Sequence, residues 1–179
     1  MADDSATIEL SHSELREVAG YAAACAHPAL AIFDRERPDD ERPRAAIDAA
    51  LSFATGAARS RRLRDCAWAA ARAAQETRDA GLVAASEAAR AAVAAAGAAF
   101  LHPLARATQV KHILAAAAHA ARAFEVSTAD DPAIGANQIA QSRILATPVV
   151  VDVLKRYPRA PLGGGRVGEL MRQLDALLR

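Results

Sequence analysis

The chain has 179 residues, is 53% hydrophobic and carries a formal net charge of +1. This length and hydrophobicity suit a single domain with a buried core, whereas a nucleic-acid binder usually shows a basic excess or a basic stripe. The sequence shows no basic region followed by an apolar run, as a signal peptide would, and no apolar run of about 18 residues. We therefore expect a cytoplasmic protein that neither binds specific nucleic acid nor crosses a membrane.

Alanine dominates the composition, while aromatic residues make up only 4%. Alanine is the best helix former and loses no side-chain entropy in a helix. An alanine-rich core lets helices approach closely, although each contact buries little area. We predict an all-α fold of about eight helices with no sheet. Cys25 and Cys66 lie among alanines, so we expect them to be buried free thiols and not a disulfide.

The N-terminal part of the chain contains one clear helix start. Residues 1–10 are predicted to form a flexible arm, and residues 11–179 a single all-helical domain. Ser11 and Glu14 have the spacing of a capping box, in which each side chain binds a free backbone N–H of the other residue. The first helix is expected to follow this motif as far as residue 26.

Prolines and glycines mark most of the later helix boundaries. Pro28, Pro43, Pro103 and Pro132 can each open a helix, because the first turn does not need their missing N–H. Gly56 can end the helix that starts at Pro43. The helices predicted in the middle of the chain cover residues 59–80, 82–99, 103–125 and 132–146. Most connections between them are short, which favours antiparallel neighbours.

The segment "PVVVDVLKRY" is ambiguous, since its β-branched residues suit a strand that would have no partner in this chain. As a helix it gathers its apolar residues on one side, so we predict a helix. The last helix, residues 167–178, has the clearest apolar stripe. Its predicted buried residues are Val167, Leu170, Met171, Leu174, Leu177 and Leu178.

Several chemistries lack their sequence signatures. "LGGGRVGEL" lacks the lysine, the hydroxyl residue and the preceding strand of a phosphate loop. It is either a flexible linker or a helix start that exposes N–H groups to an anion. His112 and His119 are seven residues apart, about 10.5 Å along a helix, whereas helical metal ligands are spaced four apart. No G-x-S-x-G motif occurs, so we predict no metal, no cofactor and no catalytic residue.

The helix predicted at residues 103–125 separates its apolar residues from a polar side. That polar side carries cationic and imidazole groups with no carboxylate one turn from Lys111. It is either an ordinary polar helix side that pairs with another helix, or a surface that binds an anionic ligand or an acidic partner. The residues of this candidate face are Thr108, Lys111, His112, His119 and Arg122.

A second group of cations comprises Arg59, Arg61, Arg62 and Arg64. These arginines are either a solvated helix start paired with nearby carboxylates, or contacts to phosphates or to an acidic partner. Cations at a helix N-terminus oppose the helix dipole, so we expect acidic neighbours inside or outside the fold. Trp68 follows on the same helix. We predict that it packs in the core, with anchoring of a partner as the alternative.

Longer strings of the sequence resemble a known family. "ERPRAAIDAALSFATG", "LHPLARATQVKHILAAAAHAARA" and "ATPVVVDVLKRYP" followed by "GGGRVGELMRQLDALLR" resemble bacterial immunity proteins of the immunity-five-like group, over residues 12–179. Some relatives carry an exonuclease-subunit label, but the ATPase apparatus of such a subunit is absent here. The resemblance implies an all-helical, non-catalytic intracellular protein that neutralises its cognate toxin by binding it.

Two other functions stay open at the level of sequence. A helical module could bind a small anionic ligand at Lys111, His112 and His119, or an enzyme could assemble its site from distant residues. The sequence predicts neither the class of the toxin nor an oligomeric state.

Overall fold

The computed structural model describes residues 6–179, which form nine α-helices and two short 3-10 helices, with no β-strand in that range. This confirms the predicted all-α fold. The 3-10 helices, His27–Ala29 and Ala107–Val110, precede α2 and α6. The α-helices are α1 (His12–Ala26), α2 (Leu30–Glu36), α3 (Arg42–Ala54), α4 (Arg61–Asp79), α5 (Val83–Ala98), α6 (Lys111–Ser127), α7 (Pro132–Leu145), α8 (Pro148–Lys155) and α9 (Gly165–Leu178).

Local signals explain where several helices begin. The Ser11 hydroxyl accepts a hydrogen bond from the N–H of Glu14 at 3.1 Å, and the Glu14 carboxylate accepts one from the N–H of Ser11 at 2.8 Å. The capping box is therefore confirmed. Asp131 and Thr147 cap α7 and α8 through their side chains, each directly before a proline. The ambiguous "PVVVDVLK" segment is thus helical, as predicted.

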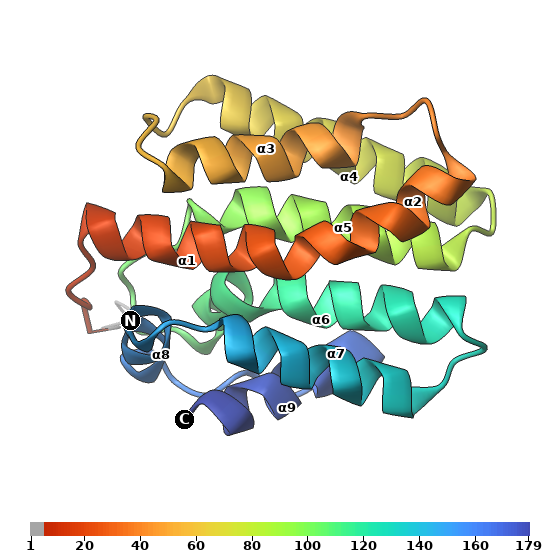
Figure 1. Cartoon of the computed structure of the whole chain (residues 1–179). Helices are drawn as coiled ribbons and strands as arrows, with labels where there is room; N and C mark the ends of the chain where they lie inside the picture. Colours follow the sequence, from red (N-terminus) through yellow and green to blue (C-terminus); the bar gives the residue numbers. More distant parts are fainter. Residues whose placement is uncertain (1–5) are drawn as a thin grey trace, which may run out of the picture.

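The helices are arranged in two layers (Figure 1). α4 and α5 lie behind α3 and α1, and α6 packs along the other side of α5. Two contacts show that α5 runs antiparallel to both neighbours: the Ser86 hydroxyl donates to the Ala74 carbonyl at 2.8 Å, and His112 Nδ1 lies 2.9 Å from the Gly97 carbonyl oxygen. α9 packs against α6 and α7.

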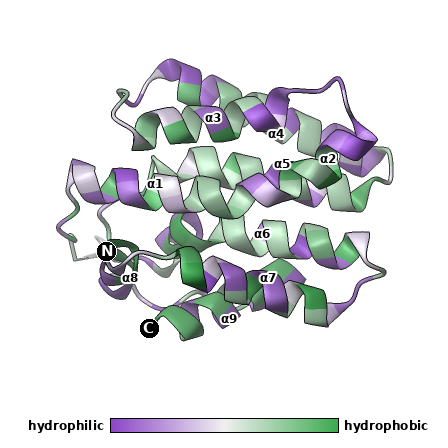
Figure 2. Cartoon of the chain, viewed as in Figure 1, coloured by the Kyte–Doolittle hydropathy of each residue, from purple (hydrophilic) through white to green (hydrophobic). Residues whose placement is uncertain are grey.

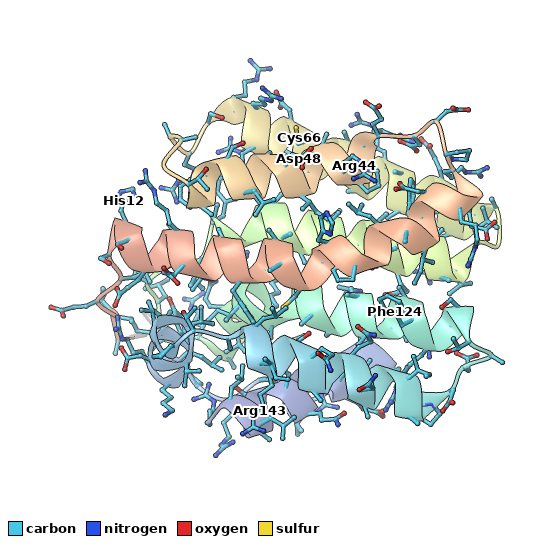
Figure 3. All side chains as sticks on the ribbon, in the orientation of Figure 1. His12, Arg44, Asp48, Cys66, Phe124 and Arg143 are labelled. Carbon is cyan, nitrogen blue, oxygen red and sulfur yellow. The ribbon has the colours of Figure 1, made fainter. Side chains whose placement is uncertain are left out.

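The core lies between the layers and is built mainly from alanine. α5 and α6 are the most consistently apolar helices in Figure 2, and buried alanines recur along both, from Ala85 to Ala123. Larger side chains such as Phe33, Phe53 and Ile113 fill the remaining space. Arg44 and Asp48 of α3, which are labelled in Figure 3, are both exposed.

A buried carboxylate connects the last helix to the rest of the fold. Glu125 of α6 is only 1% exposed, and it accepts hydrogen bonds from Arg166 of α9 at 2.6 Å and from Arg122 at 3.0 Å. Burial acts to raise the pKa of Glu125, but the two arginines outweigh it, so the pKa lies below its usual value. A Cβ atom at Gly135 would come within 2.0 Å of the Glu125 carboxylate, so α7 passes this site through a glycine.

The prediction that Pro103 opens a helix is wrong. The carbonyl of Pro103 accepts a hydrogen bond from the N–H of Ile8, and the N–H of Ala105 donates to Ala6, so this segment is extended. Helical structure begins only at Ala107. The same contacts hold part of the expected arm against the segment at Pro103, and Ile8 is 9% exposed. The part of the arm formed by residues 1–5 lies outside the described residues.

Several side chains differ in burial from the sequence expectation, among them Val167 and Met171 of the last helix, which are half-buried. Trp68 is 61% exposed, because α4 packs against α3 and α5 and leaves its other side open. Leu177, near the end of the last helix, is 43% exposed and does not belong to the buried stripe. Both cysteines are free as predicted, but only Cys25 is buried, whereas Cys66 is half-buried.

Candidate functional site

One side of α5 is left uncovered by the opposite layer. Its half-buried residues recur at helical spacing, at Glu87, Arg90, Val93, Ala94 and Gly97. We call the open side of α4, α5 and α6 the outer face. Since α4 and α5 lie behind α3 and α1 in Figure 1, the outer face points away from the viewer. Both groups of residues singled out from the sequence lie on these helices or on the segments that lead into them.

The first group is largely engaged within the protein. His112 Nδ1 donates to the Gly97 carbonyl, and burial lowers the pKa of His112, which favours the neutral ring. His119 Nδ1 lies 2.6 Å from the Glu87 carboxylate, and Arg122 pairs with Glu125 and Asp130.

Three of the five residues of the candidate face, His112, His119 and Arg122, are therefore paired with other groups of the protein. Thr108 and Lys111 stay exposed, and their docking role remains a prediction. The sequence could not reveal the Glu87 contact, because Glu87 is 32 residues away from His119 along the chain.

The second group surrounds an aromatic ring. The guanidinium groups of Arg59 and Arg64 lie 5.7 and 5.6 Å from the ring centroid of Phe100, within cation–π range. Arg59 also donates to the Ala99 carbonyl at 3.2 Å. Arg61 lies 3.6 Å from Asp65, and both side chains are open to solvent. Arg62 completes the group. Within residues 6–179, Asp65 is the one carboxylate within ion-pair distance of any of the four arginines.

Trp68 stands one helical turn after Arg64 and exposes most of its surface. We call this part of the outer face the Trp68 corner; it comprises Arg59, Arg61, Arg62, Arg64, Trp68 and Phe100. Lys111 starts α6 next to the His112–Gly97 contact, at the same end of the layer. The corner therefore combines exposed positive charge with aromatic surface. Sequence reasoning found its arginines and missed Phe100, which follows α5 with no local signal.

Elsewhere on the outer face, a pocket of about 280 Å³ opens between α4, α5 and α6. Its apolar lining is Ala71, Ala74, Val93 and Ala94, and its polar lining is Gln75, Arg90 and His119. Arg90 makes no hydrogen bond or ion pair with any described residue, and its Nε atom is buried. No sequence pattern had marked this arginine.

The described residues offer binding groups more than reactive ones. Burial raises the pKa of Cys25 to about 11, so its thiol stays protonated and is a poor nucleophile. Among residues 6–179, no cluster of three His, Cys, Asp or Glu side chains could hold a metal ion. No described helix combines the length and apolarity that a membrane crossing requires.

The family described as "Imm-5 like putative immunity protein" matches residues 8–145, which is most of the chain. The chain belongs to this immunity protein family. The match confirms the resemblance seen in the sequence and includes α4, α5 and α6 with both candidate groups. In this member of the immunity protein family, α8 and α9 follow the matched segment. No curated protein and no solved structure matches the chain.

Proposed function

We propose that this member of the immunity protein family neutralises a bacterial toxin by binding it through the outer face. The observation that carries the proposal is the family match over residues 8–145. The Trp68 corner supplies the physical support, because tryptophan and arginine are the residues that most often dominate binding energy at protein interfaces.

The geometry of the corner favours an acidic partner surface. The arginines outnumber the single nearby carboxylate, Asp65, so their charge is not balanced within the described fold. Arg59 and Arg64 already lie against Phe100, which lowers the entropy that they lose when a partner orders them. Complementary charge also speeds association, so binding should weaken as salt rises.

The experiment takes as the candidate toxin the protein encoded by the gene next to this one in its source genome. The two proteins are co-expressed in a sensitive strain, and survival is compared with that of cells expressing the toxin alone. The affinity of the purified pair is then measured for the wild type and for the double variant Arg61→Glu/Arg64→Glu. We expect wild-type protection, and a loss of affinity on the order of tenfold or more in the variant.

A matched control makes the same charge change elsewhere. Arg143→Glu/Arg159→Glu alters two exposed arginines, on α7 and after α8, which lie outside the outer face (Figure 3 labels Arg143). This control should bind as tightly as the wild type. A toxin that kills equally with and without the protein contradicts the proposed function, and equal loss of affinity in both double variants contradicts the role of the Trp68 corner.

A further inference from the structure

Arg90 occupies an unusual position on the outer face. It is half-buried, its Nε atom is shielded from solvent, and no described residue accepts a hydrogen bond from it. The shielded Nε–H donor is costly, because it has lost hydration and gains no hydrogen bond in return. The terminal nitrogens of the guanidinium remain accessible and have no acceptor among the described residues, so they can bind an acceptor that arrives from outside.

The charged and polar groups near Arg90 are engaged with other residues, so none of them binds its guanidinium. Glu87 lies one turn earlier on α5, but its carboxylate contacts His119 Nδ1 at 2.6 Å. On α4, the Gln75 amide donates to Asp79 at 2.7 Å, which occupies that carboxylate as well. Neither carboxylate comes within ion-pair distance of the Arg90 guanidinium.

The shape of the pocket suits one side chain better than a whole ligand. Its volume of about 280 Å³ lies just below the range of about 300–1,000 Å³ that is typical of small-molecule sites. Alanines of α4 and α5 form the walls and leave room beside the guanidinium. The planar fork of an arginine matches a carboxylate with two parallel hydrogen bonds.

We propose that this pocket receives an aspartate or glutamate side chain of the toxin, with Arg90 binding its carboxylate. The inference rests on the proposed function and adds a specific anchor to it. The pocket continues the Trp68 corner along α4, since Gln75 stands seven residues after Trp68, about 10.5 Å along the helix. One partner surface can therefore cover both sites.

The first test needs no toxin. Acetyl-glutamate methylamide, which presents a glutamate side chain between neutral ends, is titrated into the ¹⁵N-labelled full chain while the arginine Nε–Hε signals are followed by NMR. We expect a saturable shift of the Arg90 signal that disappears in Arg90→Gln and persists in Arg72→Gln. Arg72 is an exposed arginine of α4 that does not line the pocket, so its variant makes the same charge change nearby.

Two outcomes of this titration overturn the inference. One is a titration in which the Nε–Hε signal of Arg90 shows no saturable shift, or shifts no more than the signals of the exposed arginines. The other is tighter binding of inorganic phosphate than of the glutamate probe, which would assign the pocket to a phosphorylated ligand. Thermal melts accompany each variant; Arg90→Gln should fold normally, because its removal leaves no partner unpaired.

The second test uses the toxin and separates this inference from the proposed function. We expect Arg90→Gln to weaken the complex about tenfold or more and Arg72→Gln to leave it within about twofold. If Arg61→Glu/Arg64→Glu disrupts binding while Arg90→Gln does not, the pocket is not an anchor, although the proposed function stands. If the wild type does not bind the toxin at all, the proposed function itself fails.

Discussion

Trp68 carries one of the largest exposed apolar surfaces of the described chain, and Arg64 and Arg72 stand one helical turn before and after it on α4. An exposed side chain contributes little to folding, so we expect Trp68→Ala to change the free energy of unfolding by no more than about 0.5 kcal/mol. At the centre of an interface, truncating a tryptophan that acts as a hot spot costs about 2 kcal/mol or more of binding free energy. Denaturant melts and toxin titrations measure the two quantities on one variant.

Leu162→Ala is the matched control for Trp68→Ala, because Leu162 is 91% exposed and lies in the connection before α9. It should alter neither stability nor affinity. A large loss of stability in Trp68→Ala would show that the indole supports the fold, and unchanged toxin binding would remove it from the interface.

The ion pair between Glu14 and Arg156 makes a pH-dependent contribution to the free energy of unfolding. A hydrogen bond from Arg156 lowers the pKa of Glu14 from 4.5 to about 2, and the helix cap at Ser11 acts in the same direction. A depressed pKa stabilises the folded state above about pH 4.5, and this stability is lost as the pH falls towards 2. Glu14→Gln keeps a residue that suits the capping box but removes the charge.

We therefore expect the difference in unfolding free energy between wild type and Glu14→Gln to be constant near neutral pH. It should shrink between pH 4.5 and 2, as followed by urea melts at a series of pH values. A difference that does not depend on pH would mean that the Arg156 contact does not hold Glu14 ionised.

Residue-level features were predictable when their cause is local. The Ser11–Glu14 cap is set by three residues of spacing, and it forms as expected. The exposure of Trp68 depends instead on which sides of α4 are covered by α3 and α5, which no stretch of the sequence encodes. The sequence could not predict either that Arg90 has no acceptor among the described residues. That depends on where Glu87 and Asp79 find their partners.

At the scale of elements, α9 should contribute strongly to the core. Leu174 is fully buried against the rest of the fold. Replacing a buried leucine by alanine removes transfer free energy and leaves a cavity, so we expect Leu174→Ala to cost about 2–5 kcal/mol. Leu177→Ala is an internal control, since Leu177 is 43% exposed and should cost much less. A loss below about 1 kcal/mol for Leu174→Ala in denaturant melts would make α9 peripheral.

Helix positions followed from prolines, caps and apolar stripes, because these act within a few residues. The start of α6 did not, since the segment at Pro103 pairs with residues almost a hundred positions earlier in the chain. A proline opens a helix only where no competing backbone partner is present. The candidate face of α6 was predictable only in part. Its polar pattern can be seen in the sequence, but the partners of His112, His119 and Arg122 lie largely on other segments.

The whole molecule is larger than the segment that the family match covers. The match ends at residue 145, yet the helices beyond it bury Val150, Leu154, Leu170 and Leu174. Arg166 of α9 also pairs with the buried Glu125. Without Arg166, the buried Glu125 keeps only Arg122 as a cation partner among the described residues, and a less well compensated buried charge destabilises the fold.

We therefore predict that a chain truncated after residue 145 loses its cooperative fold. Calorimetry should show one sharp transition for the full chain and a broad or absent transition for the truncated one. A sharp transition of the truncated chain at an unchanged temperature would make the segment from residue 146 onward a separate appendage.

The Glu125–Arg166 pair also bears on the order of events during synthesis. Arg166 follows Glu125 by 41 residues, so a ribosome makes all of α1 to α8 before this partner exists. Until then Arg122 of the same helix is the one described cation that can pair with Glu125. We therefore expect α6 and α7 to close fully around this carboxylate only after α9 has been synthesised.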